Sequence, residues 1–282
     1  MVVLVRYAEI GIKGKNRERF EKILVRNIES CLKSNDVAFT KVRRAYGRII
    51  IETADECSCL RTVFGIASFS KAIKAGKTVD EAASIAKNLV EKLSENDSFR
   101  VSCQRLDKRF PLKSSEFCAR LGEKLGQSTK AKVRLENPAV DVQTEIVGGE
   151  IYLLNGRVEC AGGMPVGCQG DVVVAIEDDA SVVAALMIMK RGCNVILAMM
   201  NDVDVGLLRK FSCGKEIRQI KISSVSELDD VIVKQKALAA VLNDAFNKTS
   251  AVSLKALVLR PLSGMDEKEI ENERKKFERL AG

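Results

Sequence analysis

The sequence predicts an α/β protein in which an α+β N-terminal half precedes a doubly wound domain with a parallel sheet. Three patterns predict this: strand, helix and strand within residues 1–75, a hairpin near residue 148, and alternating strands and helices from residue 171. Alternation of strands with helices is typical of a parallel sheet covered by helices. A chain of 282 residues can hold two or three domains, each with its own core.

The first segment, residues 1–75, is predicted to be a small α+β domain. The apolar runs "VVLVRY" and "GRIIIET" are typical of strands. Between them, "RFEKILVRNIESCL" repeats apolar residues at helical spacing, as Phe20, Leu24 and Ile28 show. The stretch "CLRTVFGIASFSKAI" is predicted to be a short helix that leads into another helix.

The second segment, residues 76–165, contains a helix, a strand, a further helix and a hairpin. "TVDEAASIAKNLVEKL" is an amphipathic helix with acids in its first turn, and "FRVSCQR" alternates as a half-buried strand does. Ser114 or Ser115 is expected to cap the helix that runs to Leu125. "VDVQTEIVGGEIYLL" predicts a hairpin with Gly148 and Gly149 in its turn, and the glycine-rich "ECAGGMPVGCQG" predicts a domain junction.

The third segment, residues 166–282, alternates strands with helices. "DVVVAI", "NVILAMM", "IRQIKIS" and "ALVLRPL" are predicted strands, "SELDDVIVKQKALAAVLNDAF" is a predicted helix, and a charged helix starts at Asp266. A helix from Ala180 to Met189 is apolar almost all round, so we expect it to be buried on both sides.

Basic residues are concentrated at the front of the chain. Residues 1–75 hold 15 Lys and Arg against 8 Asp and Glu, whereas the remainder is nearly balanced. Two clusters are candidate RNA-binding sites: Lys13, Lys15, Arg17 and Arg19 after two glycines, and Arg105, Lys108, Arg109 and Lys113 on a loop. Cations that pair with phosphates release counterions, so the predicted affinity falls with salt. With no Trp and three Tyr, contacts to phosphate and shape are favoured over base stacking. Solvated surface charge remains the alternative.

The nine cysteines predict neither disulfides nor a metal site. They form no C-x-x-C pair, and the chain has no histidine. We expect most to be buried thiols in a cytoplasmic protein, with a redox pair at Cys57 and Cys59 as the alternative. The chain opens without a signal-peptide pattern, and its longest apolar run is too short to span a bilayer.

Three acids follow the strand "DVVVAI": Glu177, Asp178 and Asp179. Many nucleotide-binding proteins place glycines and serines at such a turn, to hold phosphate. Acids in the first turn instead stabilise a helix, by capping and through the helix dipole, by roughly 0.3–1 kcal/mol each. A metal site made by these three neighbours is disfavoured, because adjacent turn residues point in different directions.

Several stretches, taken in order, resemble the ThiI family of tRNA sulfurtransferases, which form 4-thiouridine. They are "RYAEIGIKGKNRERFEKILVRNI", "YGRIII", "FGIASFS", "FRVSCQRLDKRFPLKSSEF", "GGMPVGCQG", "LMIMKRG" and "VLRPLSGMDEKEI". The resemblance covers most of residues 1–200 and a patch near 258–270. It implies a ferredoxin-like domain (1–75), a THUMP RNA-binding domain (76–165) and a PP-loop domain (166–282) of adenine-nucleotide alpha hydrolase type. In active members the THUMP half docks the tRNA acceptor end, and the PP-loop uses ATP and Mg²⁺ to adenylate a uridine that is then thiolated.

The catalytic features of the family are missing from this sequence. The family's S-G-G-x-D-S loop, aligned on "LMIMKRG", falls on residues 176–181, where only Ser181 matches. "VKQKALAA" stands where the family has a glycine-containing substrate segment. No cysteine follows Cys213, and no rhodanese-like extension is present. We therefore expect a degenerate PP-loop at Glu177, Asp178, Asp179 and Ser181, with no catalytic residue, no metal and no ATP cofactor.

The leading hypothesis is a cytoplasmic tRNA-binding protein that presents tRNA to a separate modifying enzyme or chaperones it, as a homodimer and without a membrane partner. The alternative is a divergent but active tRNA sulfurtransferase, using ATP and Mg²⁺ in tRNA thiolation or thiamine thiazole formation. A third hypothesis is an assembly role, in which the apolar "VVAALMIM" helix serves as a dimer interface.

Overall fold

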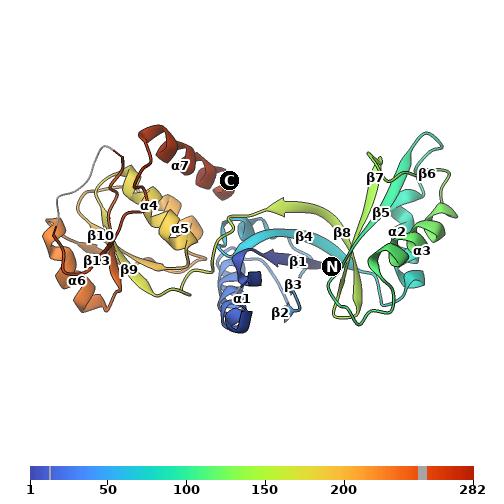
Figure 1. The fold of residues 1–282 in the computed structure, drawn as a ribbon, viewed down its shortest axis with the longest axis horizontal. Coiled ribbons are helices and arrows are strands. Elements are labelled where there is room, and N and C mark those ends of the chain that lie inside the picture. The colour runs from blue at the N-terminus through green and yellow to red at the C-terminus, as the bar shows by residue number, and fades with distance from the viewer. Residues whose placement is uncertain (13, 247–252) are drawn as a thin grey trace. The chain divides into compact units, whose positions relative to one another are not determined.

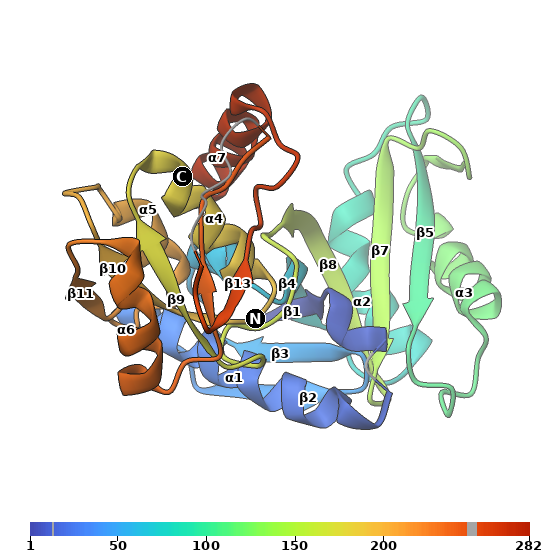
Figure 2. The same ribbon diagram turned by 60° about the vertical axis from the view of Figure 1, so that its left-hand side comes forward.

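The computed structural model describes residues 1–12, 14–246 and 253–282, without the side chains of Ile12 and Lys15 (Figures 1 and 2). The described chain forms two compact units. The first unit comprises residues 1–5, 39–54 and 69–158, and the second comprises residues 6–38, 55–68 and 159–282. Each unit therefore draws on the first 75 residues, because the chain passes between the units several times.

The first unit holds most of an eight-stranded mixed sheet, in the order β2-β3-β1-β4-β8-β7-β5-β6. The strands are β1 (Val2–Tyr7), β2 (Lys41–Ala45), β3 (Arg48–Glu52), β4 (Ile66–Lys74), β5 (Ser98–Arg105), β6 (Lys132–Val133), β7 (Val140–Val147) and β8 (Glu150–Glu159). The predicted hairpin is present: β7 and β8 pair antiparallel, and Gly148 and Gly149 adopt φ values of 60° and 78°. These left-handed conformations suit glycine because it has no Cβ.

Two helices pack beside the β5–β7 pair, α2 (Val79–Val90) and α3 (Ser114–Gly126), as Figure 2 shows. Their apolar stripes join Phe99 and Val142 in one core. Phe117 of α3 meets Phe110 edge to face, with the ring centroids 6.1 Å apart. Phe110 precedes α3 in a loop, so this contact holds the loop against the helix.

A buried ion pair crosses this sheet. The Arg48 guanidinium on β3 donates from Nε and Nη2 to the Glu145 carboxylate on β7, at 2.6 and 3.1 Å, and from Nη2 to Gln104 at 2.8 Å. Both side chains are almost fully buried. The bidentate geometry fixes how these strands face one another, because removing either partner would leave a buried charge unpaired.

The second unit contains a five-stranded, all-parallel sheet in the order β11-β10-β9-β12-β13, which confirms the predicted parallel domain. Its elements are β9 (Asp171–Ile176), α4 (Asp179–Lys190), β10 (Asn194–Met199), α5 (Gly206–Phe211), β11 (Gln219–Lys221), η4 (Val225–Glu227), α6 (Leu228–Gln235), β12 (Ala239–Val241), β13 (Leu257–Leu259) and α7 (Glu267–Ala281). From the front of the chain the unit includes η1 (Glu9–Ile12), η2 (Gly14–Asn16), α1 (Arg17–Ser34) and η3 (Ser58–Thr62).

Helices cover both faces of the parallel sheet. Val172, Val174 and Ile176 of β9 point into a core with α4, α5 and α7, whereas Val173 and Ala175 point into a second core with α6. Figure 1 shows α4 and α7 on one side of the sheet and α6 on the other. Residues of α4 from Ser181 to Leu186 are all buried, so the expected burial of this helix is confirmed.

Helix α1 is attached to the segment that enters the parallel sheet. Asn27 donates from Nδ2 to the Val166 carbonyl oxygen at 3.0 Å and accepts from Lys215 Nζ at 2.7 Å. Gly65 lies at φ +101°, and a Cβ there would come within 3.0 Å of the Pro165 side chain. Any larger residue at position 65 would push these segments apart.

Of the two helices predicted in residues 59–73, the first is present and the second was wrong. Residues 58–62 form the short helix η3, but residues 66–74 form β4. Consecutive residues Ser68, Phe69 and Ser70 of β4 are all buried, because the strand lies between β1 and β8. A strand covered on both faces does not alternate, so its sequence cannot be told from that of a buried helix.

The long helix predicted for residues 226–246 was also wrong. Helix α6 ends at Gln235, Lys236 adopts a left-handed φ of 55°, and the next residues form the central strand β12. A short apolar run such as "ALAAVL" fits either a helix or a buried strand, and here the pairing with β9 decides. Helix α5 was not predicted at all.

The predicted serine cap of α3 was wrong by one residue or two. The N-cap position belongs to Lys113, and Ser114 already lies in the helix. The Glu116 carboxylate accepts the Lys113 backbone N–H at 3.2 Å, so an acid in the first turn makes the reciprocal contact of a capping box. None of the described helices combines the length and apolar character needed to cross a membrane.

Candidate functional site

The loop between β5 and α3 exposes Lys108 and Arg109 to solvent, and hydrogen bonds from Arg105 hold the loop in place. Arg105 donates from Nη1 to the carbonyl oxygens of Phe110 and Leu112, at 3.3 and 3.0 Å, so its charge lies beneath the loop. Lys108 and Arg109 are exposed at the tip. The loop therefore holds its two outer cations on a folded scaffold.

Asp107 orients Arg109. Its carboxylate accepts from the Arg109 backbone N–H at 3.0 Å and from the guanidinium at 3.1 and 3.2 Å. These hydrogen bonds lower the pKa of Asp107, so it stays ionised at neutral pH. The Arg109 side chain is nevertheless 88% exposed and can meet a phosphate.

Two hollows flank this loop within the first unit. One of about 570 Å³ lies between the start of α2 and the second half of α3, and the other, of about 440 Å³, lies between the loop and the β7–β8 turn. Lys77, Phe110 and Pro111 line both. Phe110 and Pro111 thus lie between the two hollows, and cationic side chains line both of them.

Three further cations at these hollows were not predicted from sequence: Lys77, Arg120 and Lys124. Lys124 pairs with Asp80 at 2.6 Å, and Arg120 lies 3.9 Å from Glu116. A signal was present, because Arg120 and Lys124 are four residues apart in a predicted helix and so share a face. Their proximity to Lys77 depends on tertiary packing.

The N-terminal cation cluster belongs to the second unit, whereas the loop belongs to the first. Arg17 donates to Glu21 Oε1 at 2.9 Å and to the Tyr7 hydroxyl, and its guanidinium lies 5.3 Å from the centre of the Tyr7 ring. Arg17 is therefore engaged by its own unit. Lys13 lies outside the described residues, as does the side chain of Lys15.

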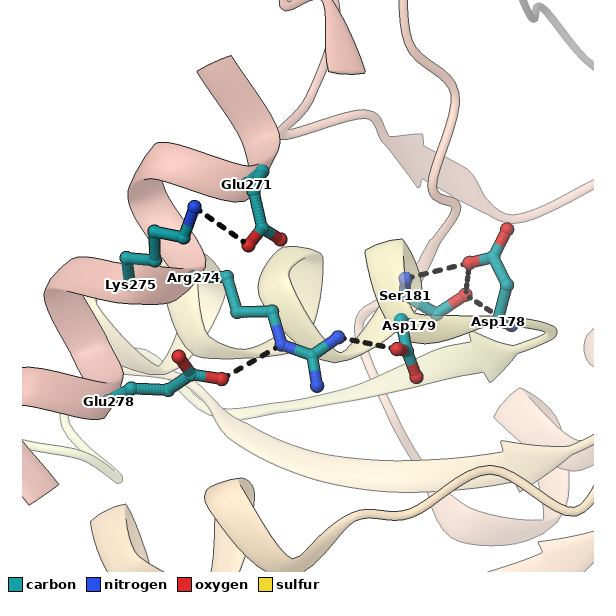
Figure 3. A network of polar contacts seen from close by, with 7 residues as sticks. All are labelled: Asp178, Asp179, Ser181, Glu271, Arg274, Lys275 and Glu278. Atoms are coloured by element: carbon teal, nitrogen blue, oxygen red, sulfur yellow. Dashed lines mark hydrogen bonds and ion pairs between the residues drawn. The ribbon is translucent and has the colours of Figure 1, made fainter. Parts of the chain in front are cut away.

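The turn between β9 and α4 is filled by its own side chains (Figure 3). Asp178 is the N-cap of α4 and accepts from the Ser181 backbone N–H and hydroxyl, both at 3.0 Å. The Ser181 hydroxyl accepts from the backbone N–H groups of Glu177 and Asp178, at 3.1 and 3.3 Å. Three N–H groups of the kind that cradle a phosphate are thus already hydrogen-bonded.

Asp179 connects α4 to the charged helix α7. Its carboxylate accepts from Arg274, which also donates to Glu278 at 3.0 Å (Figure 3). Asn243 approaches the turn from the strand edge and donates to Asp178 at 2.7 Å. Asp178 thus caps the helix, Glu177 takes part in the turn through its backbone N–H, and Asp179 pairs with another helix.

A hollow of about 590 Å³ lies beside this turn, lined among the described residues by Asp178, Asp266 and Glu267 and by one lysine, Lys268. Carboxylates at the wall repel phosphate oxygens. The charge of the lining is therefore opposite in sign to that of the electropositive site that a triphosphate needs.

Comparison with known proteins identifies two domains within residues 2–154 of the chain. The sequence pattern of the ThiI ferredoxin-like domain matches residues 2–70, and that of the THUMP domain matches residues 76–154. A probable tRNA sulfurtransferase of Thermococcus kodakarensis is 36% identical over 205 residues, which cover 69% of this chain and 54% of that protein. A protein of the same description from Methanocaldococcus jannaschii is 27% identical over 96% of this chain and 86% of its own length. The chain spans about half the length of the first curated relatives it matches.

Two solved structures resemble nearly the whole chain. PH1313 from Pyrococcus horikoshii is 27% identical and superposes with a TM-score of 0.84, over 98% of this chain and 99% of that one. A 4-thiouridine synthetase, solved with RNA and bound ATP, is 26% identical with a TM-score of 0.74, over 99% of this chain and 86% of that one. This chain therefore belongs to the ThiI family of tRNA sulfurtransferase-like proteins and carries that family's ferredoxin-like and THUMP domains.

Proposed function

We propose that this protein binds tRNA through its THUMP half, at the loop between β5 and α3. The observation that carries the proposal is the exposure of Lys108, Arg109 and Lys113 on a loop that Arg105 and Phe110 hold in place. The relative solved with RNA supports RNA as the ligand class. The acceptor end is the proposed part of the tRNA, as the family resemblance implies.

The proposal includes a negative part: the third domain does not adenylate the tRNA by itself. Asp178 and Ser181 occupy the turn where a nucleotide-binding loop would hold phosphate, and carboxylates line the adjacent hollow. The loop is on this view a degenerate PP-loop, and the protein presents tRNA to a separate modifying enzyme or chaperones it. The competing function is a divergent sulfurtransferase, supported by the names of the relatives and by the ATP-bound structure.

The test is a titration with tRNA at two salt concentrations, using intact tRNA and tRNA without its 3′ end. We expect tight binding to intact tRNA that weakens with salt and with loss of the 3′ end. The triple variant Lys108→Ala, Arg109→Ala, Lys113→Ala should bind more weakly, and its salt slope should fall by about 2 to 3 if each side chain contacts one phosphate.

A matched control removes three exposed lysines elsewhere, Lys41, Lys221 and Lys234. Its affinity should stay close to that of the unmodified protein. Equal losses in both triple variants would show that only net charge matters, and absence of any tRNA binding would overturn the proposal.

Homodimer formation remains a prediction, but the apolar helix considered for the interface is unsuited to it. Val182, Val183 and Leu186 of α4 are buried inside the second unit and cannot meet another chain. A dimer would need another surface, and sedimentation at several concentrations tests whether one forms.

A further inference from the structure

The second unit gathers cysteines that lie far apart in the sequence. Cys31 on α1 and Cys59 on η3 come together where these two helices pack, and Cys213 follows α5 nearby. All three line a cavity of about 640 Å³. From the sequence, the alternative was a redox pair between Cys59 and Cys57. In the structure Cys57 is fully buried, and its thiol donates to the Asp55 carbonyl oxygen at 3.7 Å.

Cys31 and Cys59 are in contact. The Cys31 thiol donates to the Cys59 carbonyl oxygen at 3.5 Å, and both cysteines line the same cavity. Cys31 is 2% exposed, whereas Cys59 is half-buried at the cavity wall.

The two thiols differ in acidity. The hydrogen bond from Cys31 lowers the pKa of Cys59, whereas the same bond and burial raise the pKa of Cys31. Burial raises the pKa of Cys213, at the same cavity, to about 12. Cys59 is therefore the thiol that loses its proton first, and the thiolate is the nucleophilic form.

The charges at the cavity favour an anion. Arg61, Arg209 and Lys210 line it, together with Glu56 and the carboxylate of Gly282. Positive charge at the wall attracts carboxylates and stabilises a thiolate. The ligand that fits is a small disulfide that carries carboxylates.

We propose that Cys59 and Cys31 form a thiol–disulfide exchange site for small anionic disulfides. The Cys59 thiolate attacks one sulfur of the disulfide, the S–S bond breaks, and one thiolate leaves and takes a proton from water. Cys31 then loses its proton to water, and its thiolate attacks the Cys59 sulfur of the mixed disulfide. The Cys31–Cys59 bond forms, the mixed disulfide bond breaks, and the second thiolate leaves and takes a proton from water. Two protein thiols are oxidised, and one disulfide is reduced to two thiols.

The probe is oxidised glutathione, a disulfide with several carboxylates. The protein should lose two of its nine free thiols, and peptide mapping should show Cys31 linked to Cys59. Cys31→Ala should stop at one glutathionyl group on Cys59, and Cys59→Ala should not react. Cys193→Ala is the control, because Cys193 is half-buried but does not line the cavity, and it should behave like the unmodified protein.

A pH profile separates this chemistry from a structural role. Alkylation of Cys59 by iodoacetamide should have its midpoint below that of Cys193, whose pKa burial raises. The Cys59 midpoint should rise in Cys31→Ala, because the donated hydrogen bond is lost. Nine free thiols after exposure to oxidised glutathione, or a bridge between Cys57 and Cys59, would overturn the proposal. If Cys31→Ala does not fold, the mapping and pH profile of the unmodified protein still decide.

Discussion

At the scale of single residues, the acids after β9 have distinct structural tasks. Asp178 caps α4 and accepts from Asn243, whereas Asp179 pairs with Arg274. Asp178 and Asp179 thus each meet donors at this turn, although the chain as a whole has net charge +8. The sequence predicted that acids in the first turn cap the helix. Their contacts with Asn243, which follows β12, and with Arg274 of α7 depend on the fold.

Asp178→Ala should destabilise the protein by about 1 to 2 kcal/mol, because α4 loses its cap and Asn243 loses an acceptor. Asp178→Asn keeps a capping oxygen, so its loss of stability should be only a few tenths of the loss expected for Asp178→Ala. Urea unfolding of the three proteins measures this. Equal losses for Ala and Asn would mean that the charge, rather than the cap, is the important property.

At the scale of elements, α7 is held to the second unit mainly by an aromatic cluster. Phe277 is 2% exposed and meets Phe211 edge to face at 5.5 Å and Phe64 at 6.2 Å, measured between ring centroids. The Arg274–Asp179 pair is partly exposed, with side chains 35% and 65% accessible. Buried aromatic area outweighs a screened surface ion pair.

Phe277→Ala should therefore cost about 3–5 kcal/mol of stability. Arg274→Ala should cost less than about 1 kcal/mol, because water screens its ion pair. Lys275→Ala, on the exposed face of the same helix, is the matched control and should be neutral. Denaturant midpoints give the ranking, and a greater loss for Arg274→Ala than for Phe277→Ala would contradict it.

At the scale of the whole molecule, the structural units do not follow the sequence segments. Residues 6–38 and 55–68 group with residues 159–282, although they are close in sequence to strands of the first unit. The boundaries at 75 and 165 remain predictions from the sequence. Polar contacts such as Asn27 to Val166 show how the front of the chain takes part in the second unit.

The whole protein should show no saturable binding of Mg·ATP, because its turn before α4 holds no open phosphate cradle. Isothermal titration measures this directly. Saturable binding would favour the divergent sulfurtransferase, and Ser181→Ala should then abolish it, since Ser181 is the residue that matches the active loop. The tRNA titration is independent of this result.

Local signals in the sequence determined much of this fold. Apolar periodicity located α1 and α2, a continuous apolar run located α4, the Gly148–Gly149 pair located the hairpin turn, and alternation of strands with helices predicted the parallel sheet. These features depend on neighbours in the chain, so a window of sequence contains them. The loop cations were visible for the same reason.

Only the tertiary structure decided the features that join distant segments. β4 and β12 are strands because they pair inside sheets, although their sequences fit helices equally well. Arg105 supports the loop instead of facing outward, and Cys59 meets Cys31 instead of Cys57. Each outcome depends on which surfaces are buried against one another in the folded chain. The hydrophobic effect is non-directional and acts between residues at any separation in the sequence, so a local stretch of sequence does not determine these contacts.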